Sequence, residues 1–156
     1  MMQVINQKYK EGYFKMYFTV NGNPRPQIRH KYRRVGNFIK TYDPSSEDKK
    51  VLYKKVVEFA PAKPFLASLM VQLVFYMKRP KFHFRTGKYS HLISPNAPKF
   101  HIVTPDCDNM AKLTLDVLEN AKFYKNDSQI CQLQVEKIYC ELGEKPRTEI
   151  HIEQLH

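Results

Sequence analysis

The residues best suited to chemistry lie in PDCDNMAK, residues 105–112, where two carboxylates stand two positions apart. Asp106 and Asp108 offer oxygen ligands of the kind that Mg²⁺ prefers, and Mg²⁺ is commonly held by one or two carboxylates that leave room for water and phosphate oxygens. Lys112 follows Asp108 by four residues, so on a helix the two side chains share a face. The spacing therefore predicts a divalent-metal site with a cation placed to meet negative charge on a phosphate.

A third carboxylate, Asp127, occurs in YKNDSQ, a short connection between the same helix and the strand that follows it. This spacing permits Asp127 to converge with the first two carboxylates but does not require it. A DxD pair by itself more often caps a helix or lies in a turn, and a plain capping role for Asp108 is the alternative interpretation. His101 could assist proton transfer, although a lone histidine on a strand is more often structural.

Charge is unevenly distributed along the 156 residues, which carry a formal net charge of +11. Residues 1–104 contain 20 Lys and Arg against 5 Asp and Glu, whereas residues 105–156 contain 6 against 10. Clustered cations attract polyanions and displace the counterions condensed on phosphates. We therefore expect a polyanion-binding surface upstream of the acidic cluster, although high charge can also serve solubility alone.

Two basic segments are the candidate DNA contacts, one around residues 25–34 and the other around residues 78–88. The first reads as a basic loop or irregular hairpin and the second as part of a long loop, because both contain prolines and lack periodicity. The aromatic residues of these segments could stack on splayed bases, although loop aromatics more often cover a core. The predicted contacts are Arg25, Arg29, Arg33, Arg34, Lys78, Arg79, Lys81, Arg85 and Lys88, with Tyr32, Phe82, Phe84 and Tyr89 as the stacking candidates.

The apolar pattern predicts the elements that must position these residues. Residues 13–20 read as a strand, the Asp43-Pro44 pair starts a helix that runs to about Pro61, and residues 65–77 read as a buried strand. Residues 108–122 place an apolar stripe on one face of a second helix. The carboxyl end alternates as strands do, with a phase slip around Glu136 and Lys137 that predicts a β-bulge there.

These elements predict an α/β (α+β) fold, in which a mixed, largely antiparallel sheet is packed by two main helices. The length and the 42% hydrophobic content suit a single domain over residues 1–156. No apolar run is long enough to span a bilayer and no leader is evident, so we expect a soluble cytoplasmic protein without a membrane partner. Three cysteines without metal-ligand spacing support neither zinc nor disulfides, and we expect no organic cofactor.

The segment PDCDNMAKLTLDVL followed by FYKNDSQI resembles the central signature of the RusA family of Holliday-junction resolvases. The similarity extends upstream through APKFH and FYMKRPK to NPRP, and so covers most of the chain, although only the central motif is specific. Thr104 is a departure, because members often carry a basic residue before the proline. The resemblance implies a RusA-like domain in which Asp106, Asp108 and Asp127 bind Mg²⁺, or Mn²⁺ as a substitute, while Lys112 assists cleavage; Asn109 also fits the pattern.

The resemblance further implies the function and the partners. Family members are homodimers that place two metal sites on a four-way DNA junction and resolve it by paired symmetric nicks. The expected protein is therefore a crossover junction endodeoxyribonuclease that binds branched DNA inside the cell, and a viral or phage source would fit it as well as a cellular one.

Two other functions remain open at this point. A non-catalytic basic DNA-binding module would use the acidic cluster only for structure. A nucleotide-sugar glycosyltransferase also places DxD after an apolar strand, although 156 residues is short for its nucleotide-binding domain and it gives no reason for the separated basic half.

Overall fold

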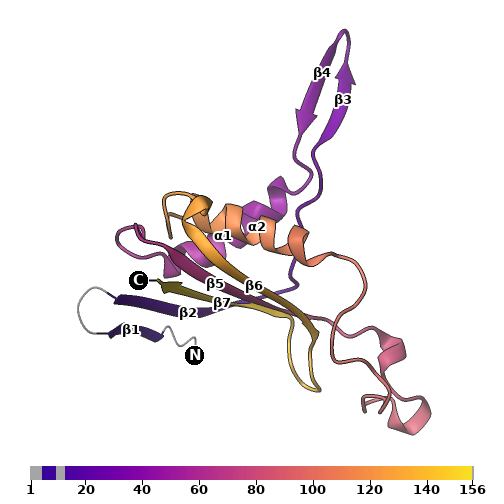
Figure 1. Ribbon diagram of the computed structural model, residues 1–156. Coiled ribbons are helices and arrows are strands. Elements are labelled where there is room, and N and C mark those ends of the chain that lie inside the picture. The colour runs from indigo at the N-terminus through magenta and orange to yellow at the C-terminus, as the bar shows by residue number, and fades with distance from the viewer. Residues whose placement is uncertain (1–4, 10–12, 156) are drawn as a thin grey trace. The chain divides into compact units, whose positions relative to one another are not determined.

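The computed structural model describes residues 5–9 and 13–155, which fold as two compact units built from interleaved segments (Figure 1). Unit 1 comprises the amino-terminal segment through Pro24, then Ser68–Thr104 and the segment from Ile130 onward; unit 2 comprises Arg25–Ala67 and Pro105–Gln129. The expectation that residues 1–156 form one domain stays a prediction. Within the described residues, no helix combines the length and the apolar character needed to cross a bilayer.

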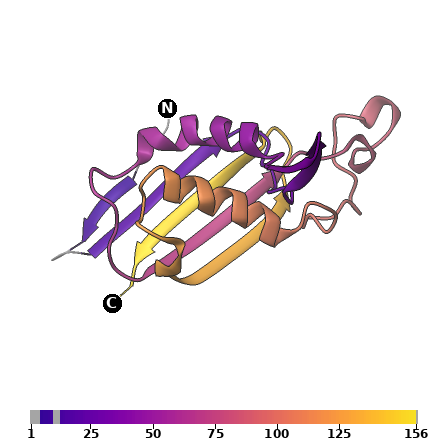
Figure 2. The same ribbon diagram turned by 90° about the horizontal axis from the view of Figure 1, so that it is seen from above.

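Unit 1 is built on a five-stranded sheet in the order β1-β2-β7-β5-β6, with its strands side by side in Figure 2. Neighbouring strands are antiparallel except for β5 and β6, which are parallel. The prediction of a mixed, largely antiparallel sheet is therefore confirmed. The strands are β1 (Ile5–Tyr9), β2 (Tyr13–Asn21), β5 (Leu69–Met77), β6 (Ile130–Tyr139) and β7 (Arg147–Gln154).

The centre of the sheet follows the apolar pattern of its strands. β5 lies between β7 and β6, and its alternate residues Leu69, Val71 and Leu73 are fully buried. On β7, Ile150 and Ile152 are fully buried as well. Burial of a side chain of this size stabilises the fold by about 1.5–3 kcal/mol, so these two strands hold the apolar core of unit 1.

β6 contains a β-bulge, but not at the position that the sequence predicted. Leu69 pairs with Ile130 and Met70 pairs with Gln132, so the extra residue is at position 131. From there to the end of the strand the pairing is unbroken, and the prediction of a bulge at Glu136 and Lys137 is wrong. The reason is that β6 is an edge strand, whose faces are not forced into strict apolar alternation; an outward apolar residue such as Leu133, 48% exposed, is tolerated there.

Unit 2 carries the two main helices, α1 (Ser46–Val56) and α2 (Cys107–Asn120), which contact each other. The apolar stripe predicted on the second helix is confirmed, because Met110, Leu113 and Val117 are all at most 2% exposed. The first helix begins after the predicted Asp43-Pro44 start. Short 3-10 helices follow both, as η1 (Val57–Phe59) and η4 (Asp127–Gln129).

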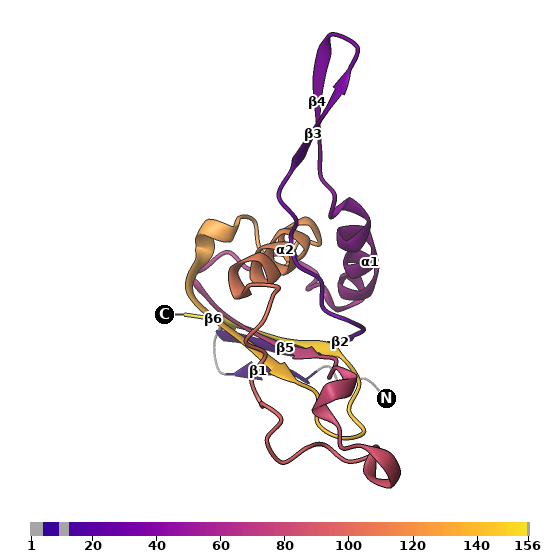
Figure 3. The same ribbon diagram turned by 90° about the vertical axis from the view of Figure 1, so that its right-hand side faces the viewer.

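The basic segment after Pro26 forms a regular two-stranded hairpin of β3 (Lys31–Val35) and β4 (Phe38–Tyr42). The sequence had indicated either a loop or an irregular hairpin for this segment. In the turn, Gly36 has a φ of +60°, a backbone conformation that is unfavourable for residues other than glycine. The hairpin extends away from both helices of its unit (Figures 1 and 3). All ten of its strand residues are exposed.

Candidate functional site

The predicted metal ligands Asp106 and Asp108 lie at the start of α2. Asp106 occupies the N-cap position with extended backbone (φ −75°, ψ 152°), and its side chain makes no capping hydrogen bond. Asp108 follows in the first turn, and both residues are exposed. Within the described part of the chain, neither carboxylate makes a hydrogen bond or an ion pair. The capping interpretation of the DxD pair is therefore not realised, and both carboxylates stay available to a ligand.

Lys112 lies one turn further along α2. Its side chain is exposed, whereas its neighbours Ala111 and Leu113 are buried. Because residues four apart on a helix lie one above the other, Lys112 shares the outer face of α2 with Asp108. The helix thus presents a carboxylate and a cation together while its opposite face supplies the core.

Asp127 is not brought to this pair within one chain. It opens η4, and its backbone N–H donates to Oε2 of Glu119 at 3.2 Å. Glu119 stands eleven residues after Asp108 on α2, which corresponds to about 16 Å along the helix axis. Among the residues that the structure describes, no three His, Cys, Asp or Glu side chains are grouped so that they could hold a metal ion. The pair and Asp127 therefore lie near opposite ends of the same helix.

The pair alone still fits a divalent cation by donor chemistry. Mg²⁺ is usually bound through one or two carboxylates, with water and substrate phosphate oxygens in its other positions. Asp106 and Asp108 supply two carboxylates that no other described residue engages, at a solvent-exposed helix start. A helix amino terminus repels a cation, so these carboxylates themselves have to hold it.

Gln27 and Ile28, just before the hairpin, form its root, and Gln27 is hydrogen-bonded to the start of α2. The backbone N–H of Gln27 donates to the carbonyl oxygen of Asn109 at 2.8 Å, one residue after Asp108. The buried Gln27 side chain donates to Oδ1 of Asp43 at 3.0 Å, and the Ile28 N–H donates to Oγ of Ser45 at 2.7 Å. These bonds join the root of the hairpin to the candidate metal site and to the start of α1.

Three charged side chains next to this root form a chain of ion pairs, the ion chain. The Lys49 ammonium lies 3.1 Å from Oδ2 of Asp43 and 2.9 Å from Oδ2 of Asp116 on α2. Burial alone would raise the pKa of Asp43, but the hydrogen bonds from Ser45, Lys49 and Gln27 outweigh it and hold the pKa below its ordinary value of 3.8. Burial alone would lower the pKa of Lys49, and the two carboxylates reverse that effect and raise it. Both groups are therefore charged at neutral pH.

The hairpin concentrates cations on one of its faces. Directly opposed residues share a face, and the register pairs Lys31 with Tyr42, Arg33 with Lys40, and Val35 with Phe38. Opposed like charges such as Arg33 and Lys40 destabilise a strand pair, and an isolated two-stranded hairpin is marginal in water. A polyanion laid on this face would relieve the repulsion. The DNA contacts predicted from the sequence omitted Lys31 and Lys40, because only the pairing register shows that they flank Arg33.

The remaining predicted DNA contacts divide into an exposed set and one exception. Arg79 is 8% exposed; its Nε donates to the carbonyl oxygen of Cys140 at 2.7 Å and its Nη1 to that of Pro98 at 2.9 Å. The prediction that Arg79 contacts DNA is therefore wrong, because its guanidinium is buried and already bound to backbone carbonyls. The exposed contacts are Arg25, Arg29, Arg33 and Arg34 in unit 2, and Lys78, Lys81, Arg85 and Lys88 in unit 1.

His101 belongs to unit 1 and packs there on Tyr139, with ring centroids 4.8 Å apart. Burial, and then the charge of Lys137, lower the pKa of His101 below its ordinary 6.5. His101 is 9% exposed, so the structural interpretation of this histidine fits its surroundings better than a role in proton transfer.

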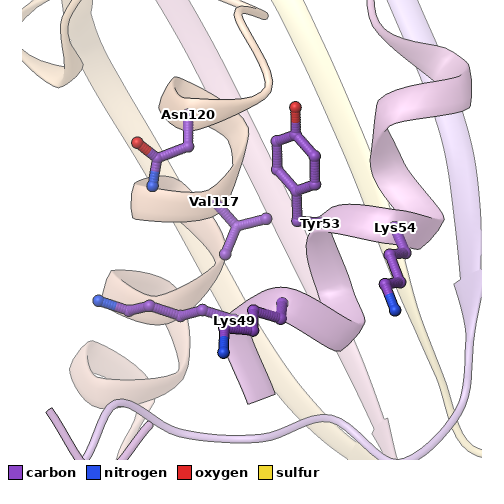
Figure 4. A pocket seen from close by; sticks show the side chains of 6 residues that line it. Lys49, Tyr53, Lys54, Val117 and Asn120 are labelled. Atoms are coloured by element: carbon purple, nitrogen blue, oxygen red, sulfur yellow. The ribbon is translucent and has the colours of Figure 1, made fainter. Parts of the chain in front are cut away.

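A groove of about 290 Å³ between α1 and α2 contains none of the predicted site residues (Figure 4). Lys50, Lys54 and Lys49 line it together with Tyr53, Val117 and Asn120. It offers no carboxylate and is therefore no candidate for the metal site.

Comparison with known proteins gives one family. A family model described as "Endodeoxyribonuclease RusA" matches residues 21–153, nearly the whole chain, and includes PDCDNMAK, Asp127 and both basic segments. No curated protein matches the chain.

Replacing Asp43 with Asn is expected to lower the free energy of unfolding by about 1–3 kcal/mol at pH 7, because it removes one of the two charged partners of Lys49. A carboxyl whose pKa is lower in the folded state stabilises above its unfolded value of 3.8, and this contribution is lost as the pH falls through the folded-state pKa. The difference between wild type and variant should therefore close below about pH 3.8. Urea unfolding at several pH values measures it.

The matched control is Glu58→Gln, which removes an exposed carboxylate on η1. It should leave the unfolding free energy unchanged within about 0.5 kcal/mol. An Asp43→Asn protein as stable as this control at pH 7 would contradict the role given to the ion chain.

Proposed function

Since the chain belongs to the RusA family of endodeoxyribonucleases, which act on branched DNA junctions, we propose that it resolves Holliday junctions with Mg²⁺ held by Asp106 and Asp108. The observation that carries the proposal is the pair of exposed carboxylates, free of other bonds in the described structure, at the start of α2. This pair lies inside the segment that the family model matches.

The residues of the site have separable roles in the proposal. Asp106 and Asp108 bind and orient the ion, and Mn²⁺ can replace Mg²⁺ because oxygen ligands suit both. When bound, the ion supplies Lewis-acid polarisation of the scissile phosphate and a more acidic water. Lys112, on the face of Asp108, places a positive charge beside the phosphate and stabilises negative charge as it develops.

We further propose a homodimer that makes paired symmetric nicks, because a twofold protein suits the pseudo-twofold symmetry of a four-way junction. The position of Asp127 supports an active role for the second copy. Within unit 2, Asp127 lies near the opposite end of α2 from Asp106 and Asp108. A third carboxylate for each site then comes from the Asp127 of the other copy.

The β3–β4 hairpin is the proposed DNA arm. Lys31, Arg33 and Lys40 lie on one face of it, and hydrogen bonds of Gln27 tie its root to α2 and to Asp43. Contacts between such cations and DNA phosphates neutralise the backbone charge and position the duplex. The arm would therefore hold the strand near the carboxylates that act on it.

The two alternatives left open by the sequence fare differently. A nucleotide-sugar transferase is set aside, because the chain belongs to a nuclease family. A non-catalytic DNA-binding module differs from the proposal in one respect, which is metal-dependent cutting.

Purified protein incubated with a labelled four-way junction and Mg²⁺ is expected to give paired nicks near the crossover, none on linear duplex and none with EDTA. Asp108→Asn should lower the cutting rate by at least about 100-fold, because one of the carboxylates that hold the metal ion is lost, while junction affinity stays within a factor of about three. Gel analysis of both strands measures this. Glu58→Gln is the control carboxylate and should cut at the wild-type rate. Cutting by Asp108→Asn at that rate, or none by wild type with any divalent metal, would refute the catalytic assignment.

The double variant Arg33→Ala with Lys40→Ala is expected to weaken junction binding about tenfold or more, since two phosphate contacts are removed. The slope of log affinity against log salt concentration should become shallower by about two. Fluorescence anisotropy in EDTA measures both quantities. Lys63→Ala with Lys145→Ala removes two exposed cations outside the arm and should change neither. Equal salt slopes for the two double variants would contradict the role of the hairpin.

Co-expressed Asp108→Asn and Asp127→Asn chains test whether each site uses two copies. If Asp127 acts across the dimer, the mixed dimer contains one site in which all three aspartates are intact, so it should nick one strand although each variant alone is inactive. If Asp127 acts within its own chain, both sites of the mixed dimer lack a ligand. A mixture as inactive as its components would therefore contradict the shared site.

A further inference from the structure

The segment 78–104 of unit 1 surrounds a pocket of about 670 Å³, within the range of pockets that bind small organic groups. The segment extends from the sheet of its unit (Figures 1 and 3). Phe82 and Ile102 line the pocket and are 79% and 84% exposed, and Val103 beside them is 55% exposed. Large apolar side chains held open to water in one place mark a binding surface.

The inner wall of the pocket is a packed group of aromatic rings. His83 and Tyr139 are each 5% exposed, with ring centroids 4.6 Å apart, and His101 also packs on Tyr139. Arg79 lies over the Tyr139 ring at 5.3 Å and is fixed by its bonds to the Cys140 and Pro98 carbonyls. The buried Arg79 therefore serves the pocket by making its wall rigid.

The two histidines of this wall are uncharged at neutral pH. Burial, and then the charge of Arg79, lower the pKa of His83, and the pKa of His101 is lowered as well. In His101, Nδ1 is buried and makes no hydrogen bond within the described structure. The pocket is therefore backed by neutral aromatic rings.

The segment that surrounds the pocket, by contrast, is basic. Residues 78–104 contain six Lys and Arg and no Asp or Glu; among these cations Arg79 is buried and Lys78 lines the pocket. Ser94 and Asn96 add hydrogen-bonding groups to the lining. A group that fits is therefore flat and aromatic, carries hydrogen-bonding edges, and is attached to a polyanion.

We propose that this pocket receives a single nucleobase that has left the base stack of a DNA strand, with Phe82 and Ile102 packing on the base and Ser94 and Asn96 meeting its edge. Stacking on aromatic side chains accepts every base, while a basic groove follows the backbone. The inference rests on the proposed function only in assigning the base to a junction crossover, where strands exchange and bases can unstack.

Binding of a 12-residue oligothymidine and of an abasic strand of the same length, both in EDTA, tests the pocket without a junction. Wild type should bind the oligothymidine about tenfold more tightly, as expected for one stacked base. Phe82→Ala and Ile102→Ala should each bring this ratio close to one, and both side chains are exposed enough that their truncation spares the core. Phe100→Ala is the control, because Phe100 is an exposed aromatic of the same segment that does not line the pocket.

A wild-type ratio near one, or a ratio that Phe82→Ala and Ile102→Ala leave unchanged, would overturn the proposal. Sedimentation of the same proteins identifies the competing occupant: a change of oligomeric state in Phe82→Ala with an unchanged ratio assigns the pocket to a second copy and likewise overturns it. A wild type that shows the base-dependent ratio but no preference for four-way junctions over duplex supports the pocket and refutes the proposed function instead.

Discussion

The Asp43–Lys49–Asp116 ion chain holds together the part of the molecule on which the proposed activity depends. Lys49 belongs to α1, Asp116 to α2, and Asp43 ends the segment that leads out of the hairpin. A cation shared by two carboxylates at about 3 Å fixes the three elements at one place. Hydrogen bonds from the Gln27 backbone and side chain then carry this restraint to α2 and to Asp43. Positioning of this kind is costly to lose, because reacting groups must be held within fractions of an ångström.

Two features of unit 2 are unfavourable for folding, and the proposed ligands, a divalent ion and DNA, would relieve them. Asp106 stands at a helix N-cap without capping, so a stabilising bond worth about 1 kcal/mol is not made. Arg33 faces Lys40 across an exposed hairpin that has no core of its own. A bound divalent ion would satisfy the carboxylates at the helix start, and DNA phosphates would neutralise the opposed cations. Functional sites commonly keep such unfavourable contacts because the ligand relieves them.

The sequence predicted features that depend on local pattern and missed those that depend on pairing in space. The stripe that includes Met110 and Val117 follows helical periodicity, so α2 was predicted within two residues at each end. The regular hairpin was left open because prolines and Gly36 also suit irregular loops. Arg79 was misassigned because a cation in a basic run shows no sign of the carbonyls that bury it. The separation of Asp127 from Asp106 follows from the length of α2, and the predicted convergence would need a second chain.

The central claim is that Asp106 and Asp108 hold the divalent ion, and cleavage of the protein by bound iron tests it most directly. Fe²⁺ also binds carboxylate oxygens, and with ascorbate and peroxide it breaks peptide bonds next to the site it occupies. The account predicts chain breaks within residues 104–110 that excess Mg²⁺ suppresses and that Asp108→Asn abolishes. Breaks confined to other segments, or breaks within residues 104–110 that persist in Asp108→Asn, would contradict it.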